Sequence, residues 1–138
     1  MSSDRIALAT AFAAALVLAA PAAQAQPIEP GRFAGVYDGQ IFSSGSNRPG
    51  ATALRPATDG TLLGDYSFTE PSGEVMQGEL RACRASGRKL ACRWSDPYGV
   101  GDLEMEFAAD FASFRGRWRA DNAKGRWNPW TGRRRATS

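Results

Sequence analysis

Residues 102–119 read DLEMEFAADFASFRGRWR, and this stretch contains a complete β-hairpin pattern. Apolar and charged residues alternate on both sides of a central turn at residues 108–113. Folding the chain about the centre of this turn pairs apolar residues on one face, Phe107 with Phe114 and Leu103 with Trp118. On the other face it pairs acid with base, Glu106 with Arg115, Glu104 with Arg117 and Asp102 with Arg119. Because side chains alternate between the two faces of a strand, this pattern predicts one antiparallel register.

The rest of the chain repeats this pattern. Short runs of alternating apolar residues are separated by glycine-rich turns, and no stretch after residue 32 holds a helical apolar period over several turns. We expect strands at residues 33–42, 51–56, 61–68, 74–84, 90–95, 102–108, 113–119 and 125–132. Regular short strands between turn signals indicate an all-β fold. The sequence therefore predicts an antiparallel up-and-down barrel of about eight strands.

A Gly-x-aromatic triplet recurs in four of the predicted strands, ending at Tyr37, Tyr66, Trp118 and Trp127. Residues two apart in a strand share a face, so each glycine is expected beside a large ring inside the barrel. Two interpretations stay open, a ring-lined pocket at the barrel mouth and a core that the rings fill completely. In both, Trp118 and Trp127 are predicted to be buried.

The two cysteines lie on a second predicted hairpin, where Cys83 and Cys92 face each other across a turn at residues 86–89. In an oxidising compartment they are expected to form a disulfide. The apolar alternation, however, puts Ala82 rather than Cys83 on the inner face, so a β-bulge beside the turn is needed to bring the cysteines together. The Cys-x-x-Cys spacing typical of redox-active pairs is missing.

The N-terminus resembles a secretory signal peptide. Residues 6–20 are an unbroken run of apolar and small residues, Pro21 follows, and Ala23-Gln24-Ala25 has the small-x-small form of a cleavage site. A retained membrane anchor is less favoured, because the run is shorter than the ~20 residues of a membrane-spanning helix. We expect a signal peptide at 1–25, a linker at 26–32, the barrel domain at 33–132 and a basic tail at 133–138. The protein is predicted to be periplasmic or secreted and bacterial.

The composition excludes several classes of enzyme and metal site. The chain has 138 residues, 17 Lys+Arg, 14 Asp+Glu, two Cys and no His. The absence of histidine excludes a Ser-His-Asp triad, a Cys-His pair and a His-ligated metal site, and we expect no metal and no cofactor. A carboxylate-based hydrolase needs two acids flanking a substrate bond, whereas Glu104 and Glu106 are predicted to face arginines. The chain is therefore predicted not to be an enzyme, and a hydrolase is the third-ranked function.

Basic residues gather near the C-terminus, where Arg133, Arg134 and Arg135 are consecutive. They would allow weak contact with an anionic surface. The preferred interpretation is a solvated tail. Nucleic acid is not expected as a partner of an exported protein.

The outline resembles the calycin group of small eight-stranded barrels, which includes lipocalins and avidins. The residues that carry the resemblance are Phe33-Ala34-Gly35-Val36-Tyr37, the Gly60–Tyr66 step GTLLGDY, and the late Gly-x-Trp strands. Tyr37 stands where the lipocalin signature has tryptophan. Asp38, Ser43 and Ser44 do not match the biotin pocket of avidins, so the resemblance implies no biotin-binding residues. Some bacterial periplasmic inhibitors of proteases and lysozymes are similar small barrels, but no inhibitor motif is recognisable.

The predicted function is binding. The favoured ligand is a small apolar or amphipathic molecule held at the barrel mouth by Tyr37, Tyr66, Trp94, Trp118 and Trp127. The alternative is an envelope interaction protein or inhibitor with a solid core, which grips a protein partner through surface loops. Candidate loops are residues 43–50 and 96–102, which also fit ordinary turns.

Overall fold

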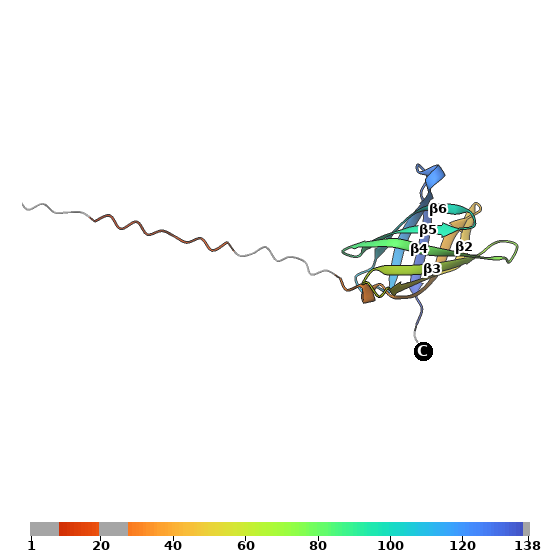
Figure 1. Cartoon of the computed structure of the whole chain (residues 1–138), viewed down its shortest axis with the longest axis horizontal. Coiled ribbons are helices and arrows are strands. Elements are labelled where there is room, and N and C mark those ends of the chain that lie inside the picture. Colours follow the sequence, from red (N-terminus) through yellow and green to blue (C-terminus); the bar gives the residue numbers. More distant parts are fainter. Residues whose placement is uncertain (1–8, 20–27, 137–138) are drawn as a thin grey trace, which may run out of the picture.

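Eight antiparallel strands close into a barrel in the computed structural model of the chain, which describes residues 9–19 and 28–136 (Figure 1). Each strand pairs with its neighbours in sequence, and the last strand pairs with the first. The strands are β1 (Gly35–Ser43), β2 (Ser46–Pro56), β3 (Leu62–Thr69), β4 (Val75–Ser86), β5 (Lys89–Asp96), β6 (Gly99–Phe107), β7 (Ser113–Ala120) and β8 (Asn128–Arg134). Two short 3-10 helices, η1 (Pro30–Arg32) and η2 (Asp121–Ala123), complete the fold. The predicted all-β up-and-down barrel is confirmed.

Residues 9–19, which belong to the predicted signal peptide, contain no helix or strand, and their side chains are exposed. The predicted cleavage site at Ala23-Gln24-Ala25 lies outside the described residues. Within the described ranges, no helix combines the length and the apolar character needed to span a membrane.

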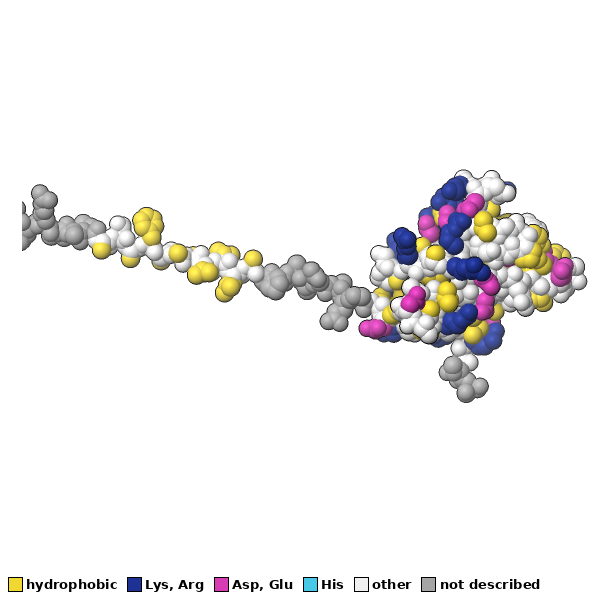
Figure 2. Space-filling model, viewed as in Figure 1, with side chains coloured by type: hydrophobic (Ala, Val, Ile, Leu, Met, Phe, Trp, Pro, Cys, Tyr) yellow, Lys and Arg dark blue, Asp and Glu magenta, His cyan; other side chains and the backbone are white. Residues whose placement is uncertain are grey.

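The β6–β7 hairpin has the predicted register. All of the predicted pairs are present, from Phe107 with Phe114 to Asp102 with Arg119. The apolar members face the core, whereas Glu104 and Arg117 are exposed and form an ion pair with an N–O distance of 2.9 Å. Charges of both signs are interspersed over the visible face of the barrel (Figure 2). The uneven charge along the sequence is thus partly neutralised between neighbouring strands.

Large rings cover glycines of the neighbouring strand. Tyr66 of β3 lies opposite Gly78 of β4, and a Cβ atom at Gly78 would lie 2.1 Å from the tyrosine ring. Phe114 covers Gly132 of β8 in the same way, at 2.5 Å. The triplets predicted that each glycine would lie beside a ring of its own strand. The closest glycine–ring contacts instead join neighbouring strands. Directly opposite residues are about 4.5–5.5 Å apart, closer than the ~6.7 Å between residues two apart in one strand.

One end of the barrel is plugged by aromatic side chains. Phe33, which follows η1, packs edge-on against Phe107 and Phe111, with ring centroids 5.1 Å apart in both pairs. Phe111 lies in the β6–β7 turn with a φ of 57°, and its ring is buried. Tyr37 and Phe114 continue the cluster into the barrel. The interior at this end is filled by the protein's own side chains.

The two predicted loops are shorter than expected. The β1–β2 turn contains only Ser44 and Gly45, whose φ angles of 53° and 85° are positive, as a two-residue type I′ hairpin turn requires. Residues 46–49 pair with β1 but not with β3, and a proline such as Pro49 is tolerated beside such a free edge. Similarly, β6 begins at Gly99, directly after the turn that follows Asp96. Both segments are hairpin turns rather than long overhanging loops.

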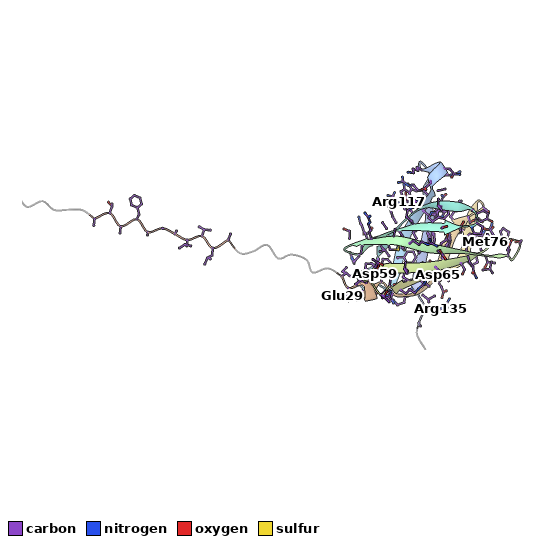
Figure 3. The ribbon with its side chains drawn as sticks, in the orientation of Figure 1. Glu29, Asp59, Asp65, Met76, Arg117 and Arg135 are labelled. Atoms are coloured by element: carbon purple, nitrogen blue, oxygen red, sulfur yellow. A yellow bond between two sulfur atoms is a disulfide. The ribbon has the colours of Figure 1, made fainter. Side chains whose placement is uncertain are left out.

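The last strand lies further along the chain than predicted, because β8 spans Asn128–Arg134 instead of residues 125–132. Arg133 and Arg134 therefore belong to the barrel rather than to a solvated tail. Arg135, which follows the strand, donates two hydrogen bonds to the carboxylate of Asp38 in β1, at 2.8 and 2.5 Å. Figure 3 labels Arg135 near the C-terminal exit of the chain.

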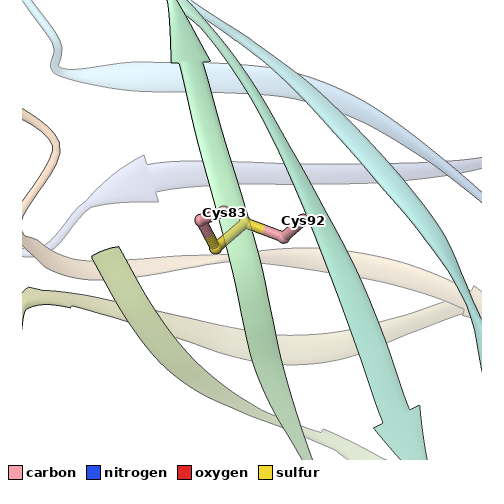
Figure 4. The surroundings of a disulfide bond; sticks show 2 residues. All are labelled: Cys83 and Cys92. Carbon is pink, nitrogen blue, oxygen red and sulfur yellow. A yellow bond between two sulfur atoms is a disulfide. The ribbon is translucent and has the colours of Figure 1, made fainter. Parts of the chain in front are cut away.

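The predicted disulfide between Cys83 and Cys92 is confirmed and links β4 to β5 (Figure 4). The predicted bulge lies beside it, as a shift in register between Arg81 and Arg84. Ala82 has a φ of 51° and is exposed, while Cys83 packs against the core. The inward position predicted for Ala82 is thus wrong. The extra residue of the bulge inverts the alternation of faces.

Candidate functional site at the barrel mouth

The end of the barrel opposite the aromatic plug holds a small cavity of about 40 Å³. Rings from β1, β3, β5, β7 and β8 line it, among them Phe68 and Trp130. An open groove of about 360 Å³ adjoins the cavity, because Phe42, Tyr98 and Trp118 line both. The cavity is much smaller than the ~300–1,000 Å³ of pockets that enclose a drug-sized ligand. It therefore has room for a group of a few heavy atoms, and the groove has room for the remainder of a ligand.

Three of the five predicted ligand-binding residues meet at this mouth. Tyr66, Trp94 and Trp118 line the cavity, and the rings of Trp94 and Trp118 pack edge-on with centroids 5.4 Å apart. Tyr37 lies instead in the aromatic plug at the opposite end. Trp127 lies outside the barrel, where the guanidinium groups of the β7 arginines at positions 117 and 119 cover its ring at 4.1 and 4.4 Å. The burial predicted for Trp127 is wrong, and Trp118 is half-buried.

The structure adds residues that the sequence did not single out. Trp130 is buried with 2% exposure, and Phe68 and Tyr98 complete the aromatic lining. Trp130 also carries a signal that was present in the sequence, since it lies two residues before Gly132 and forms an inverted aromatic-x-Gly triplet. If the last strand had been predicted at residues 128–134, Trp130 and Gly132 would have been assigned to the inner face.

The N–H groups of the mouth tryptophans are occupied by the protein itself. Trp94 donates to the carbonyl of Arg119 at 3.2 Å, and Trp118 donates to the carbonyl of Phe42 at 3.1 Å. Trp130 donates to the hydroxyl of Thr52 at 2.9 Å. An indole has a single donor and no acceptor. These three rings therefore offer a ligand only apolar and π surface.

Two carboxylates lie at the mouth. Asp96 accepts hydrogen bonds from the Tyr66 hydroxyl at 2.6 Å and from the Tyr98 amide at 2.8 Å. Glu70, which is only 9% exposed, accepts from the hydroxyls of Ser43 and Ser44 at 3.1 and 3.2 Å. Burial and the Asp96 carboxylate raise the pKa of the Tyr66 phenol well above its usual value. Tyr66 therefore stays protonated and donates to Asp96 throughout the physiological pH range.

Larger depressions of about 530 and 780 Å³ lie on the outer faces of the strands. Their lining includes members of exposed ion pairs, such as Glu104 with Arg117 and Asp65 with Arg55. Figure 3 labels Asp65 and Arg117 on the barrel. Surface pairs of this kind are screened by water and hold their charges without a ligand. The aromatic mouth is therefore the stronger candidate for a binding site.

Within residues 9–19 and 28–136, no cluster of three or more His, Cys, Asp or Glu side chains is arranged to hold a metal ion. The two cysteines are joined in the disulfide.

The closed, all-antiparallel barrel of eight strands is compatible with a calycin-like fold. Comparisons with protein-family models, with curated proteins and with solved structures found no match to this chain.

Proposed function

We propose that this protein is an exported binding protein that holds one end of a small amphipathic ligand at the mouth of its barrel. The observation that carries the proposal is the recessed aromatic cavity formed with Tyr66, Trp94, Trp118 and Trp130, opening into a wider groove. Burial of a ligand's apolar atoms against these rings is favourable by roughly 25 cal/mol per Å². The resemblance to lipocalins supports the same function.

The proposed location outside the cytoplasm has two supports. The Cys83–Cys92 disulfide is consistent with an oxidising compartment, since disulfides are rare in cytosolic proteins. The apolar run at residues 6–20 with the small-x-small site after it is typical of a signal peptide.

A second candidate is a protein partner gripped by the turns at the mouth. The filled interior at the Phe33–Phe111 end favours it, because the barrel has little enclosed space. Tyr98, which lies in the β5–β6 turn and is 61% exposed, is a suitable aromatic anchor for such a contact.

The test uses the indole N–H signals of the four tryptophans in a ¹H–¹⁵N spectrum of the mature protein. The ligands are hexanol, hexanoate and hexyltrimethylammonium, which share a tail and differ in headgroup charge. We expect at least one of them to shift the signals of Trp94, Trp118 and Trp130 and to leave Trp127 unchanged, because Trp127 lies on the outer surface.

The matched variants are Trp118→Ala and Trp127→Ala. Trp118→Ala removes a wall of the cavity and should weaken binding, whereas Trp127→Ala should not. If none of the three compounds shifts the cavity signals, the small-ligand function is wrong. Retention of an envelope protein that depends on Tyr98 would then establish the second candidate.

A further inference from the structure

The two carboxylates at the mouth have different partners from the arginine-paired carboxylates of the outer surface. Six outer carboxylates form ion pairs with arginines: Asp38, Asp65, Glu79, Asp102, Glu104 and Asp121. At the mouth, Asp96 and Glu70 are held by hydroxyl and amide donors. Among the residues that the structure describes, no Lys or Arg nitrogen lies within 4.0 Å of either carboxylate. The mouth therefore carries negative charge that is not neutralised by an adjacent cation.

The donors around the cavity are directed at acceptors of the protein. The phenol of Tyr66 and the hydroxyls of Ser43 and Ser44 donate to the two carboxylates. The indole N–H groups of the lining tryptophans donate to Phe42, Arg119 and Thr52. A ligand group that needs hydrogen-bond donors, such as a carboxylate or a phosphate, finds none of these available. Its charge would also be repelled by Asp96.

A cation, by contrast with an anion, matches the groups that line the cavity. The ring faces of tryptophan and tyrosine attract an ammonium group within about 6 Å of their centroids, and more strongly where water is excluded. The cavity combines such rings with Asp96, which lines it directly, and has room for only a few heavy atoms. Glu70 lies beside this position, bonded to Ser43, which also lines the cavity.

The basic groups nearby lie outside the cavity. Arg126 borders the adjoining groove and is exposed. Arg48 donates to the backbone carbonyl of Ser43 at 3.4 Å. Arg126 is therefore placed to contact the part of a ligand that lies in the groove, whereas Arg48 lines neither the cavity nor the groove.

Building on the proposed function, we propose that the group inserted into the mouth is a small alkylammonium cation. Its positive charge is stabilised by Asp96 and Glu70, and its alkyl groups contact the rings of Trp94, Trp118 and Tyr66. The remainder of the ligand lies in the groove beside Tyr98.

The experiment compares choline with its neutral isostere, in which a tert-butyl carbon replaces the trimethylated nitrogen. Dissociation constants are measured on the mature protein from the indole signals of Trp94, Trp118 and Trp130. Choline is expected to bind more tightly than the isostere. Asp96→Asn and Glu70→Gln keep the shape and remove one charge, and each should weaken choline binding by about tenfold. Asp65→Asn and Glu104→Gln, on the outer surface, are the matched controls and should leave choline binding unchanged.

The outcomes separate the two proposals. The proposal of a cationic ligand group is overturned if choline and the isostere bind equally, or if the Asp96→Asn variant binds choline as tightly as the unmodified protein does. Neither result contradicts the small-ligand function. The cationic group is likewise overturned, and the small-ligand function stands, if only hexanol or hexanoate shifts the cavity signals. If none of the three hexyl compounds shifts them, the proposed function itself is overturned. Glu70→Gln also alters the hydrogen bonds to the serine hydroxyls, so its fold is checked by circular dichroism. If this variant does not fold, Asp96→Asn alone provides the test.

Discussion

The guanidinium group of Arg134 lies over the ring of Tyr37, with its central carbon 5.0 Å from the ring centroid, and donates a hydrogen bond to the phenol oxygen at 2.8 Å. It also donates to the backbone carbonyls of Arg32, Ala34 and Phe111. One side chain at the end of β8 thus ties together the start of β1, the segment around η1 and the β6–β7 turn. This arrangement closes the plugged end of the barrel.

Replacement of Arg134 by alanine should destabilise the protein by about 2–3 kcal/mol, because several partly buried acceptors lose their donor at once. Arg133→Ala is the matched control, since the Arg133 side chain is exposed, and it should change stability by no more than about 0.5 kcal/mol. Urea denaturation followed by tryptophan fluorescence measures both. Equal effects of the two changes would contradict the tying role of Arg134.

Trp130→Ala should cost about 3–5 kcal/mol, as large-to-small changes in a core do. Trp130 is 2% exposed and bonded to Thr52, whereas Trp127 is half-buried on the outer surface. Trp127→Ala should cost about 1 kcal/mol or less, the size of an exposed cation–π contact. Glu104→Ala should cost ~0–1 kcal/mol, because its ion pair with Arg117 is exposed. An effect of Trp130→Ala no larger than that of either surface variant would contradict the assignment of inner and outer faces.

Acid should destabilise the barrel in part through Arg93. This arginine donates to Asp102 at 2.8 Å and to Asp121 at 2.7 and 2.5 Å, and these bonds hold the pKa of both carboxyls below the usual range. Because the folded pKa values are depressed, the stabilisation is present above the unfolded value of about 3.9 and is lost as the pH falls through the folded values. The melting temperature should therefore fall less steeply between about pH 5 and pH 2 for Arg93→Met than for the unmodified protein. Parallel curves would refute this role.

Reduction of the disulfide should destabilise the native state. The bond between Cys83 and Cys92 closes a loop of about ten residues, for which chain-entropy estimates give roughly 2–3 kcal/mol. We expect the lower end of that range, because the hairpin already holds the cysteines close together. Denaturation of the Cys83→Ser/Cys92→Ser double variant measures the effect. Thiol titration of the unfolded, unreduced protein should detect no free cysteine, and two reactive thiols would disprove the bond.

Export should remove the N-terminal segment. Intact-mass measurement on the periplasmic or secreted fraction should show a chain that starts at Gln26, directly after the predicted cleavage site. A chain that retains Met1 in the inner membrane would instead establish the segment as an anchor.

The β6–β7 register and the disulfide could be predicted because their determinants are close together in sequence. In residues 102–119, each strand carries one apolar and one charged set, and only one register matches both sets. The cysteines are nine residues apart, so the parity conflict between Ala82 and Cys83 revealed the need for a bulge before its position was known. Turn lengths were less accessible, because Ser44 and Gly45 form the β1–β2 turn within a longer run of polar residues.

The sequence by itself thus determined the class of fold, the hairpin pairing and the disulfide, since local alternation of apolar and polar residues is enough to specify them. Only the tertiary structure decided which tryptophan lies inside. Trp130 is placed by pairing with Ile41 of β1 and Gly116 of β7, and Ile41 is far away in the chain. The mouth has the same origin. Glu70 follows β3 and Asp96 ends β5, and both lie beside the aromatic rings only because closure of the barrel brings alternate turns together at one end.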